Sequence, residues 1–234
     1  MDDGAPCEIS ADGETAAVVF VDMAGFTALT EALGDHRAAD VAEEFAAMSR
    51  SLLQPGGLLV KTIGDAVFVT TPDADAAVVF VRRLFTETRA RGGFPVLRGG
   101  IAFGPVVRSR IDTYGATVNL AARLAAFARP GQTVVTRDVA AVARAQGLTV
   151  SELGATTLRN VAEPVDVFVV EDPAGCQFAD VDPVCRTRLD DGTTVREIAH
   201  GATVYRFCSA RCADRFARGV PASALVDWCE NAHP

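Results

Sequence analysis

The sequence has no long apolar run and no export signal. No continuous apolar stretch approaches the roughly 18 residues that suggest a membrane-spanning helix. The N-terminal residues 1–4 are acidic and lack the basic and apolar regions of a signal peptide. We therefore expect a cytoplasmic protein with no membrane partner.

The chain also lacks an excess of positive charge. It has 22 Lys and Arg against 30 Asp and Glu, which gives a net charge of −8 at pH 7. Proteins that bind nucleic acid normally present a basic face, so we expect no nucleic-acid partner. A pocket for a nucleotide phosphate needs only one or two cations and is compatible with this balance.

Cysteine is scarce in the first three quarters of the chain. Cys7 stands alone there, and the other five lie near the C-terminus: Cys176, Cys185, Cys208, Cys212 and Cys229. Without export, a disulfide framework is not expected. Clustered cysteines in a cytosolic chain indicate metal ligands first. Cys7, Cys176 and Cys229 fit no pattern that assigns them a role.

What the chain does contain is enough apolar material for one main domain and a small appendage. It has 234 residues, 49% of them hydrophobic. The apolar run at 16–21 predicts a buried strand. A helix is predicted from Asp35, its N-cap, to the break at 55–57, because apolar residues recur on one face: Val41, Phe45, Met48 and Leu52.

The later elements complete a recognisable order. Residues 58–63 and 66–70 predict a hairpin, and Asp73 is a suitable N-cap for a second helix. A strand at 96–107, a helix at 118–127 and a strand at 133–136 follow, and a linker is expected at 172–175. The order strand, helix, hairpin, helix, strand predicts an α+β fold with a ferredoxin-like βαββαβ core.

Two aspartates fall where a metal site could form. Asp22 follows the strand at 16–21, and Asp65 follows Gly64 at the tip of the hairpin. The first strand and the hairpin strand are neighbours in a ferredoxin-like sheet, so the two carboxylates can converge. Such oxygen ligands, completed by phosphates, suit Mg²⁺ or Mn²⁺. The alternative is that Asp65 only forms a turn and Asp22 only ends a strand.

Four ordered segments resemble the signature motifs of the class III nucleotidyl cyclases. They read FVDMAGFT (20–27), KTIGD (61–65), RGGIAFG (98–104) and GATVNLAARL (115–124). Four motifs in the family's order are far more specific than any one of them. The resemblance covers residues 13–171, which we predict to be a cyclase domain.

The resemblance implies roles for four of these residues. Asp22 and Asp65 match the aspartates that hold two Mg²⁺ or Mn²⁺ ions in each site. Lys61 and Asp112 match the pair that selects adenine, because Lys donates to a ring nitrogen and Asp accepts from the exocyclic amine. Guanylate cyclases usually carry Glu and Cys there, so a guanylate cyclase is a weaker reading. Without the motif, Lys61 would be read as a solvated surface residue.

Asn119 and Arg123 lie four residues apart on one face of a predicted helix. The resemblance implies that Asn119 orients the ribose and that Arg123 stabilises charge on the phosphate in the transition state. The alternative is an exposed Asn–Arg pair. The implied reaction is attack of the ribose 3′-oxygen on the α-phosphate of ATP, which yields cyclic AMP and pyrophosphate. No His lies in a motif, so metal activation of the hydroxyl is the simplest account.

Members of this family build each site between two catalytic domains. This chain carries all six positions on one domain, so a homodimer with two equivalent sites is implied. The segment from Gly104 to Asp112 is shorter than in many members, where it includes an arm that grips the partner. The strength of the dimer is therefore left open.

The C-terminal cysteines resemble a YHS or TRASH-like metal-binding domain over residues 180–221. A DPVC segment ends at Cys185, and Cys208 and Cys212 are spaced i, i+4 as on one side of a helix. Three thiolates suit Zn²⁺ or Cu⁺, with His200 as a candidate fourth ligand. The alternatives are that the cysteines pack a minor core and that His200 is merely exposed.

Two functions of different classes remain. The first is an adenylate cyclase regulated by its C-terminal module through metal or redox state. The second is a non-enzymatic metal sensor whose cyclase domain only dimerises or binds nucleotide. Retention of all six site positions favours the enzyme.

Overall fold

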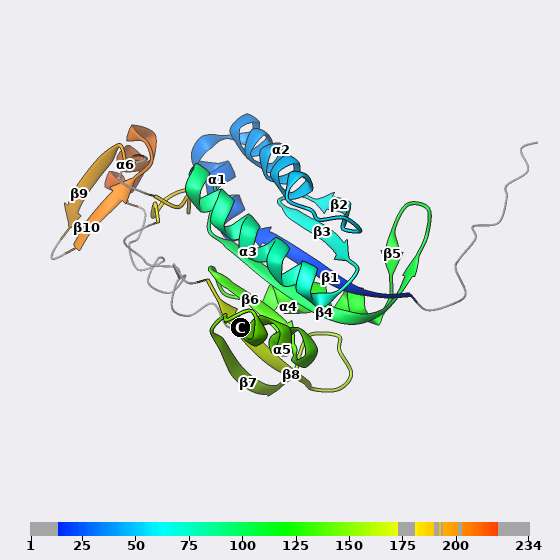
Figure 1. Cartoon of the computed structure of the whole chain (residues 1–234). Helices are drawn as coiled ribbons and strands as arrows, with labels where there is room; N and C mark the ends of the chain where they lie inside the picture. Colours follow the sequence, from blue (N-terminus) through cyan, green and yellow to red (C-terminus); the bar gives the residue numbers. More distant parts are fainter. Residues whose placement is uncertain (1–13, 173–180, 190–191, 193, 201–202, 220–234) are drawn as a thin grey trace, which may run out of the picture.

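The computed structural model describes residues 14–172, 181–189, 192, 194–200 and 203–219 (Figure 1). Within these ranges, no helix combines the length and the apolar character needed to cross a membrane. Cys7, Cys176, Cys229 and most of the predicted linker at 172–175 lie outside the described residues.

One mixed sheet of eight strands forms the centre of the molecule. Its strands follow the order β2-β3-β1-β4-β6-β8-β7, with the short β5 paired to β4. β4 and β6 run parallel, and the other paired strands run antiparallel. The strands are β1 (Glu14–Met23), β2 (Leu58–Ile63), β3 (Ala66–Thr71), β4 (Leu97–Arg108), β5 (Thr113–Tyr114), β6 (Gln132–Thr136), β7 (Val150–Thr156) and β8 (Val165–Glu171).

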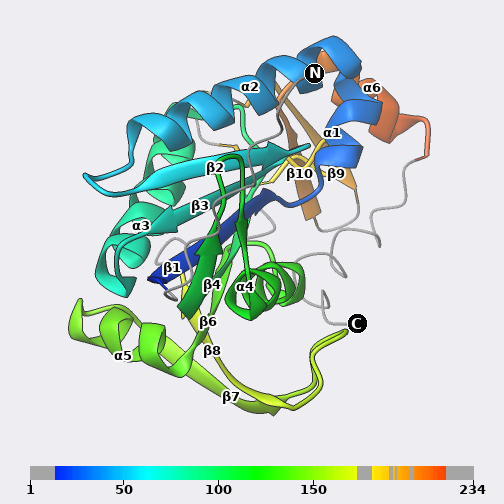
Figure 2. The same ribbon diagram turned by 90° about the vertical axis from the view of Figure 1, so that its right-hand side faces the viewer.

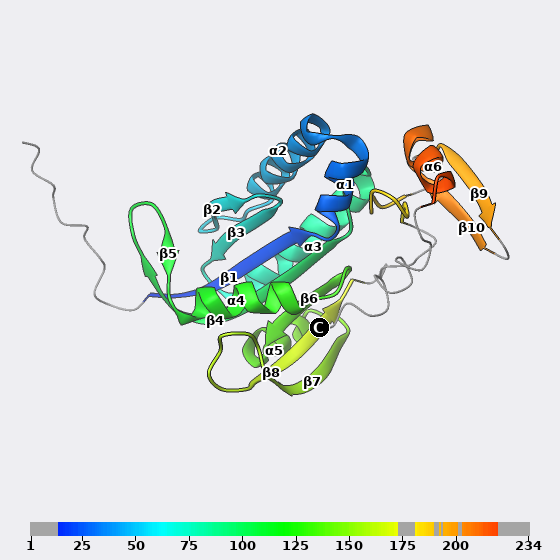
Figure 3. The ribbon, with the colours of Figure 1, turned by 180° about the vertical axis from the view of Figure 1, so that it is seen from behind.

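Five helices cover this sheet unevenly. They are α1 (Phe26–Leu33), α2 (Asp35–Ser51), α3 (Ala74–Arg91), α4 (Ala116–Phe127) and α5 (Arg137–Ala145). α3 lies in front of the sheet in Figure 1, and α4 lies in front when the molecule is seen from behind in Figure 3. Figure 2 shows α1 and α2 along the β2–β3 side of the sheet and α5 near β7.

The central strand β1 is buried on both faces. Ala17, Val19 and Val21 contribute to the core beneath α1, α2, α3 and α5. Ala16 and Val18 alternate with them and face the second core beneath α4. A strand covered on both faces reads as a continuous apolar run, which is why the sequence predicted it well.

The α4 helix packs unusually close to β4. A Cβ on Gly100 would lie 2.2 Å from Ala125 N and 2.4 Å from Ala121 O, so only glycine allows this approach. The helix begins after Gly115, and Thr117 donates a hydrogen bond to Pro105 O at 2.7 Å. These contacts fix the helix that carries Asn119 and Arg123.

The mixed α+β architecture and the order β1, helix, β2, β3, α3, β4 match the prediction, except that two helices, α1 and α2, stand where one was expected. Asp73 caps α3 as expected, because Ala76 N donates to its carboxylate at 2.8 Å. The predicted cap at Asp35 is wrong. Gly34 occupies the cap position with a φ of 91°, and Asp35 is the first residue of α2. A tight bend between two consecutive helices requires a positive φ there, which favours glycine.

A small C-terminal unit lies beside α1 (Figure 1). It consists of the antiparallel pair β9 (Arg196–His200) and β10 (Thr203–Phe207), followed by α6 (Ala210–Ala217). Phe216 on α6 packs its ring 5.2 Å from that of Phe207 and 4.8 Å from that of Tyr205. Three aromatic rings thus supply much of the apolar contact in a unit with little other core.

Candidate functional site

Two carboxylates converge at one end of β1. Asp22 pairs with Ala66 of β3, which brings the β2–β3 turn and Asp65 beside it. Burial, and then the neighbouring Asp22 carboxylate, raise the pKa of Asp65 to about 7. A divalent cation would relieve this repulsion, so the two carboxylates fit the ions expected from the sequence.

Arg98 is a third member of this cluster. It lies opposite Asp22 on β4, and its Nε and Nη2 donate to one Asp22 oxygen at 2.9 and 2.7 Å. Arg98 lies in the motif at 98–104, but its sequence context indicated no role for it. The antiparallel register of β1 and β4 would have revealed the partner, because it sets the two residues side by side.

The predicted base-selecting residues are joined by an ion pair. Lys61 on β2 donates to Asp112 Oδ2 at 2.5 Å across 51 residues of sequence. This hydrogen bond holds the pKa of Asp112 below its usual value. Lys61 is the single lysine in the chain, and its ammonium lies 5.9 Å from the Phe68 ring centroid. The pair lies at the open edge of the sheet.

The segment before Asp112 forms a projecting hairpin. β4 extends to Arg108 and turns back into β5, so this arm stands away from the sheet in Figure 1. Ser109 fixes the turn, because its Oγ accepts from Asp112 N at 3.0 Å. Although this segment is short, it therefore forms an ordered arm that ends at Asp112.

Asn119 and Arg123 share an exposed side of α4. Asn119 lines a hollow of about 360 Å³ together with Phe103, Thr117 and Asn160. Among the described residues, Arg123 forms no ion pair or side-chain hydrogen bond, so its guanidinium is available to an anion. In the described part of the chain, no hydrogen bond or ion pair joins α4 to Asp22, Asp65, Lys61 or Asp112.

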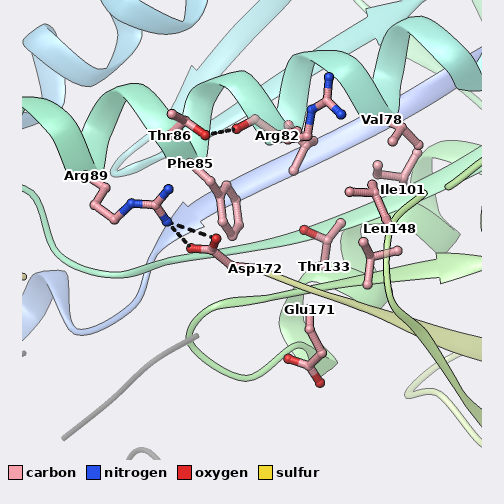
Figure 4. A pocket seen from close by; sticks show the side chains of 12 residues that line it. Val78, Arg82, Phe85, Thr86, Arg89, Ile101, Thr133, Leu148, Glu171 and Asp172 are labelled. Carbon is pink, nitrogen blue, oxygen red and sulfur yellow. Dashed lines mark hydrogen bonds and ion pairs between the residues drawn. The ribbon is translucent and has the colours of Figure 1, made fainter. Parts of the chain in front are cut away.

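A separate apolar pocket lies between α3 and the sheet (Figure 4). Its volume is about 150 Å³, and its walls include Val78, Phe85 and Ile101. Arg89 Nη1 donates there to both carboxylate oxygens of Asp172, at 3.0 and 3.1 Å. None of the predicted site residues lines this pocket.

Four potential metal ligands gather in the C-terminal unit. The ligand atoms of Asp182, Cys185, Cys208 and Cys212 all lie within 4.8 Å of one another. The Cys185 and Cys208 sulfurs are 3.4 Å apart, and those of Cys208 and Cys212 are 3.9 Å apart. Tetrahedral zinc with bonds of about 2.3 Å places sulfurs about 3.8 Å apart, so the spacing fits.

The helical placement of Cys208 was predicted wrongly. Cys208 lies before α6, Ser209 is the N-cap, and Cys212 lies in the first turn. The N-cap turn still brings the two sulfurs together, because Ser209 Oγ accepts from Cys212 N at 3.2 Å. The side chain of the other candidate ligand, His200, lies outside the described part of the structure.

Asp182 was missed as a member of the cysteine cluster. Its carboxylate accepts hydrogen bonds from Val184 N at 2.7 Å, Cys185 N at 3.2 Å and Cys208 N at 2.8 Å. It therefore ties the turn that carries Cys185 to the end of β10. Its place in the DPVC segment was visible in the sequence, but the long-range contact with Cys208 was not.

The three thiols shift one another's pKa. Hydrogen bonds from Cys185 and Cys208 lower the pKa of Cys212 to about 3, whereas hydrogen bonding to Cys208 raises that of Cys185 well above its usual value. Burial raises the pKa of Asp182. A soft cation could replace the remaining thiol protons, which is the behaviour expected of a thiolate metal site.

Comparison with known proteins relates the main domain to nucleotide cyclases. Residues 91–172 match the family model described as the adenylate and guanylate cyclase catalytic domain. The chain is 34% identical over 157 residues to a pH-sensitive adenylate cyclase of Mycobacterium tuberculosis, covering 65% of this chain and 40% of that protein. It is 42% identical over 114 residues to an adenylate cyclase of Streptomyces coelicolor, covering 48% of this chain and 30% of that protein. The chain thus spans less than half the length of these two curated relatives.

Solved structures show the same fold. The adenylyl cyclase CyaB from P. aeruginosa matches with a TM-score of 0.57 and 24% identity, over 69% of this chain and 95% of that one. The adenylate/guanylate cyclase/hydrolase from Silicibacter pomeroyi matches with a TM-score of 0.56 and 27% identity, over 68% and 98%. The main domain therefore has the α+β fold of cyclase catalytic domains.

Proposed function

We propose that this chain is an adenylate cyclase that converts ATP to 3′,5′-cyclic AMP and pyrophosphate at a homodimer interface. Residues 13–171 are its catalytic domain, and residues 180–221 are its metal-binding module. The observation that carries the proposal is the convergence of Asp22 and Asp65. Two neighbouring carboxylates are hard oxygen ligands, which suit a metal-dependent reaction of a nucleoside triphosphate.

Each site residue has a defined task in this proposal. Asp22 and Asp65 hold two Mg²⁺ or Mn²⁺ ions, with Arg98 orienting Asp22. When bound, such ions increase the acidity of the ribose hydroxyl and stabilise charge on the phosphates. The 3′-oxygen forms a new bond to the α-phosphorus, the bond to the β-phosphate oxygen breaks, and the hydroxyl proton is lost to solvent.

The base is read by Lys61 and Asp112. Their ion pair, 2.5 Å long, places a donor and an acceptor side by side, which is the pattern that the adenine edge requires. ATP must exchange this hydrogen bond for its own contacts. Asn119 then orients the ribose, and the Arg123 guanidinium donates to the phosphates in the transition state.

Exposed apolar side chains support the homodimer. Leu58 and Ile63 on β2 and Tyr114 on β5 are about half exposed, and Ile111 at the tip of the arm is 85% exposed. These side chains lie on the same edge as Lys61 and Asp112. A partner that covers this edge would bury them and would bring its own α4 toward the carboxylates.

The C-terminal module binds one Zn²⁺ or Cu⁺ ion through Cys185, Cys208 and Cys212. The sulfur spacing and the lowered pKa of Cys212 support this assignment. The occupied module regulates the cyclase.

The test is production of cyclic nucleotide by the purified chain with ATP or GTP and Mn²⁺. Cyclic AMP should form, and the variants Asp22→Asn and Asp65→Asn should form none while they keep the wild-type circular dichroism spectrum. A preference for GTP would contradict the assignment of the base pocket. No product from either nucleotide would favour a non-enzymatic metal sensor instead.

A further inference from the structure

The C-terminal unit touches the loop that follows Asp22. A Cβ on Gly25 would lie 2.5 Å from Arg186 Cγ and 2.7 Å from Arg186 Cβ, so the Arg186 side chain packs directly on the Gly25 backbone. Gly25 has a φ of 88° and is the N-cap of α1. Both the backbone conformation and the close contact therefore require glycine at this position.

Arg186 is rigidly linked to the cysteine cluster. It directly follows Cys185, and its N–H donates to Asp182 O at 3.0 Å. Its φ of 63° is rare for a residue with a side chain. The Asp182 carboxylate accepts from Cys208 N at the same time, so Asp182 anchors both the cysteine cluster and the turn that presents Arg186.

Gly25 is linked as directly to the carboxylate cluster. Asp22 and Gly25 are three residues apart, and Ala24 N between them donates to Val96 O at 2.8 Å. The segment after Arg186 lies against the residues that lead into β4. Arg188 N donates to Phe94 O at 2.9 Å, and Thr187 pairs with Pro95. One short segment therefore lies between the sulfur cluster and the residues that position Asp22.

Other contacts between the C-terminal unit and α1 are weaker. Arg215 approaches Glu31 at 3.5 Å, and Arg211 donates to Leu33 O at 3.4 Å. Both contacts are exposed and long, and such surface pairs contribute little. Of these contacts with α1 and its N-cap, the packing of Arg186 on Gly25 is the closest.

We infer that Arg186 is a positioning residue that couples the metal occupancy of the cysteine cluster to the affinity of the Asp22 loop for the metal–nucleotide complex. This inference rests on the proposed cyclase function. Coupling of two sites is reciprocal: if zinc changes nucleotide affinity by a given factor, the nucleotide must change zinc affinity by the same factor. The relation can therefore be tested by binding alone.

The experiment measures the zinc dissociation constant of the full chain in zinc-buffered solution, with and without saturating Mg²⁺ and 3′-deoxy-ATP. This analogue lacks the attacking hydroxyl and cannot be cyclised. The affinity of the analogue is measured by calorimetry with and without zinc. For the wild-type chain we expect both constants to change by the same factor, of about fivefold or more.

Variants of Arg186 identify the contact. Arg186→Ala removes the Cγ and Cδ that pack on Gly25, so the coupling factor should fall to about one while zinc still binds stoichiometrically. Arg186→Lys keeps those methylenes and should retain the coupling. Arg196→Ala is the matched control, because it removes an exposed arginine of the same unit, which pairs with Asp214, and leaves Gly25 untouched.

The outcomes separate this inference from the proposed function. Equal zinc affinity with and without bound 3′-deoxy-ATP would overturn the coupling and leave the cyclase intact. Undiminished coupling in Arg186→Ala would overturn the role of Arg186. Failure of the wild-type chain to bind 3′-deoxy-ATP would overturn the proposed function itself, and failure to bind zinc would overturn the metal-dependent link.

Discussion

At the scale of single residues, Asp65 has the most strongly shifted pKa among the carboxylates of the proposed nucleotide site. Its pKa is raised to about 7 by burial and by Asp22, so the folded protein keeps a proton there that the unfolded chain releases near pH 4. Folding therefore favours the protonated form between these two values. In the metal-free protein, stability from this group is present at low pH and is lost as pH rises toward 7.

The first prediction follows from this loss of stability with rising pH. In the presence of a chelator, the melting temperature of the wild-type chain should fall between pH 5 and pH 8, and Asp65→Asn should reduce that fall. Thermal unfolding followed by circular dichroism measures both. Asp73→Asn is a suitable control, because this exposed acid is the cap of α3 and asparagine caps equally well. Identical profiles of melting temperature against pH for Asp65→Asn and the wild type would contradict the raised pKa of Asp65.

The second prediction concerns base selection. Lys61→Glu combined with Asp112→Cys removes both proposed adenine contacts, so kcat/KM for ATP should fall by about 10- to 100-fold or more. The measurement is kcat/KM for ATP and GTP in the wild type and the double variant. An unchanged preference for ATP would refute the base assignment. Gain of guanylate cyclase activity is not required, because pocket shape also contributes to specificity.

At the scale of elements, the sequence predicted the elements that carry a local signal. The strand at 16–21 is a continuous apolar run, and the hairpin around Asp65 and the Asp73 cap follow from turn and cap chemistry. The helix α1, its junction with α2 and the start of α6 were not predicted. Position 34 is set by a tight bend, and Cys208 by the contact of its N–H with Asp182, and both depend on residues that local spacing does not include.

The candidate site divides in the same way. The family resemblance assigned Lys61 and Asp112 to base selection, but only the fold shows that they form an ion pair across 51 residues. Arg98 and Asp182 were missed because each acts through a partner on a distant strand or turn. Residues that support a site are set by tertiary contacts, whereas the residues that do its chemistry carry a local pattern.

The third prediction tests how α4 is held. Gly100→Ala introduces a Cβ 2.2 Å from a backbone nitrogen of α4, so the free energy of unfolding should fall by about 1–3 kcal/mol. Cyclase activity should fall with it, because Asn119 and Arg123 move with the helix. Gly99→Ala is the matched control, since its nearest neighbours would lie at 3.4 Å. Equal stability of the two variants in urea unfolding would contradict the close packing.

The fourth prediction concerns the cysteine cluster. The Cys208→Ser, Cys212→Ser double variant should bind no zinc or copper, whereas Cys7→Ser, which changes a cysteine that is not part of the C-terminal sequence pattern, should retain one ion per chain. Elemental analysis after reconstitution measures both. Chelation of the wild type should increase hydrogen exchange in the C-terminal module but not in the main domain. Equal metal content in the two variants would show that these cysteines are core residues.

At the scale of the whole molecule, the proposed sites form between two copies of the chain. The fifth prediction is that inactive Asp22→Ala chains mixed with inactive Arg123→Ala chains regain activity. A mixed dimer holds one intact and one doubly damaged site, so an equal mixture should recover up to about a quarter of wild-type activity. Absence of recovery, with mixed dimers confirmed by differential tagging, would refute a shared site.

The docking of Arg186 on Gly25 joins the late part of the chain to an early loop, and this has a consequence for synthesis. The sheet is complete at the end of β8, at Glu171, before Cys185 has been translated. At about 5–20 residues per second, the ribosome needs a few more seconds to deliver Cys212. Because domains fold as units in the order of their synthesis, each new molecule has a folded main domain before the contact with Arg186 can form. For that interval, the Gly25 backbone lacks the packing of the Arg186 side chain, and the proposed coupling to zinc cannot operate.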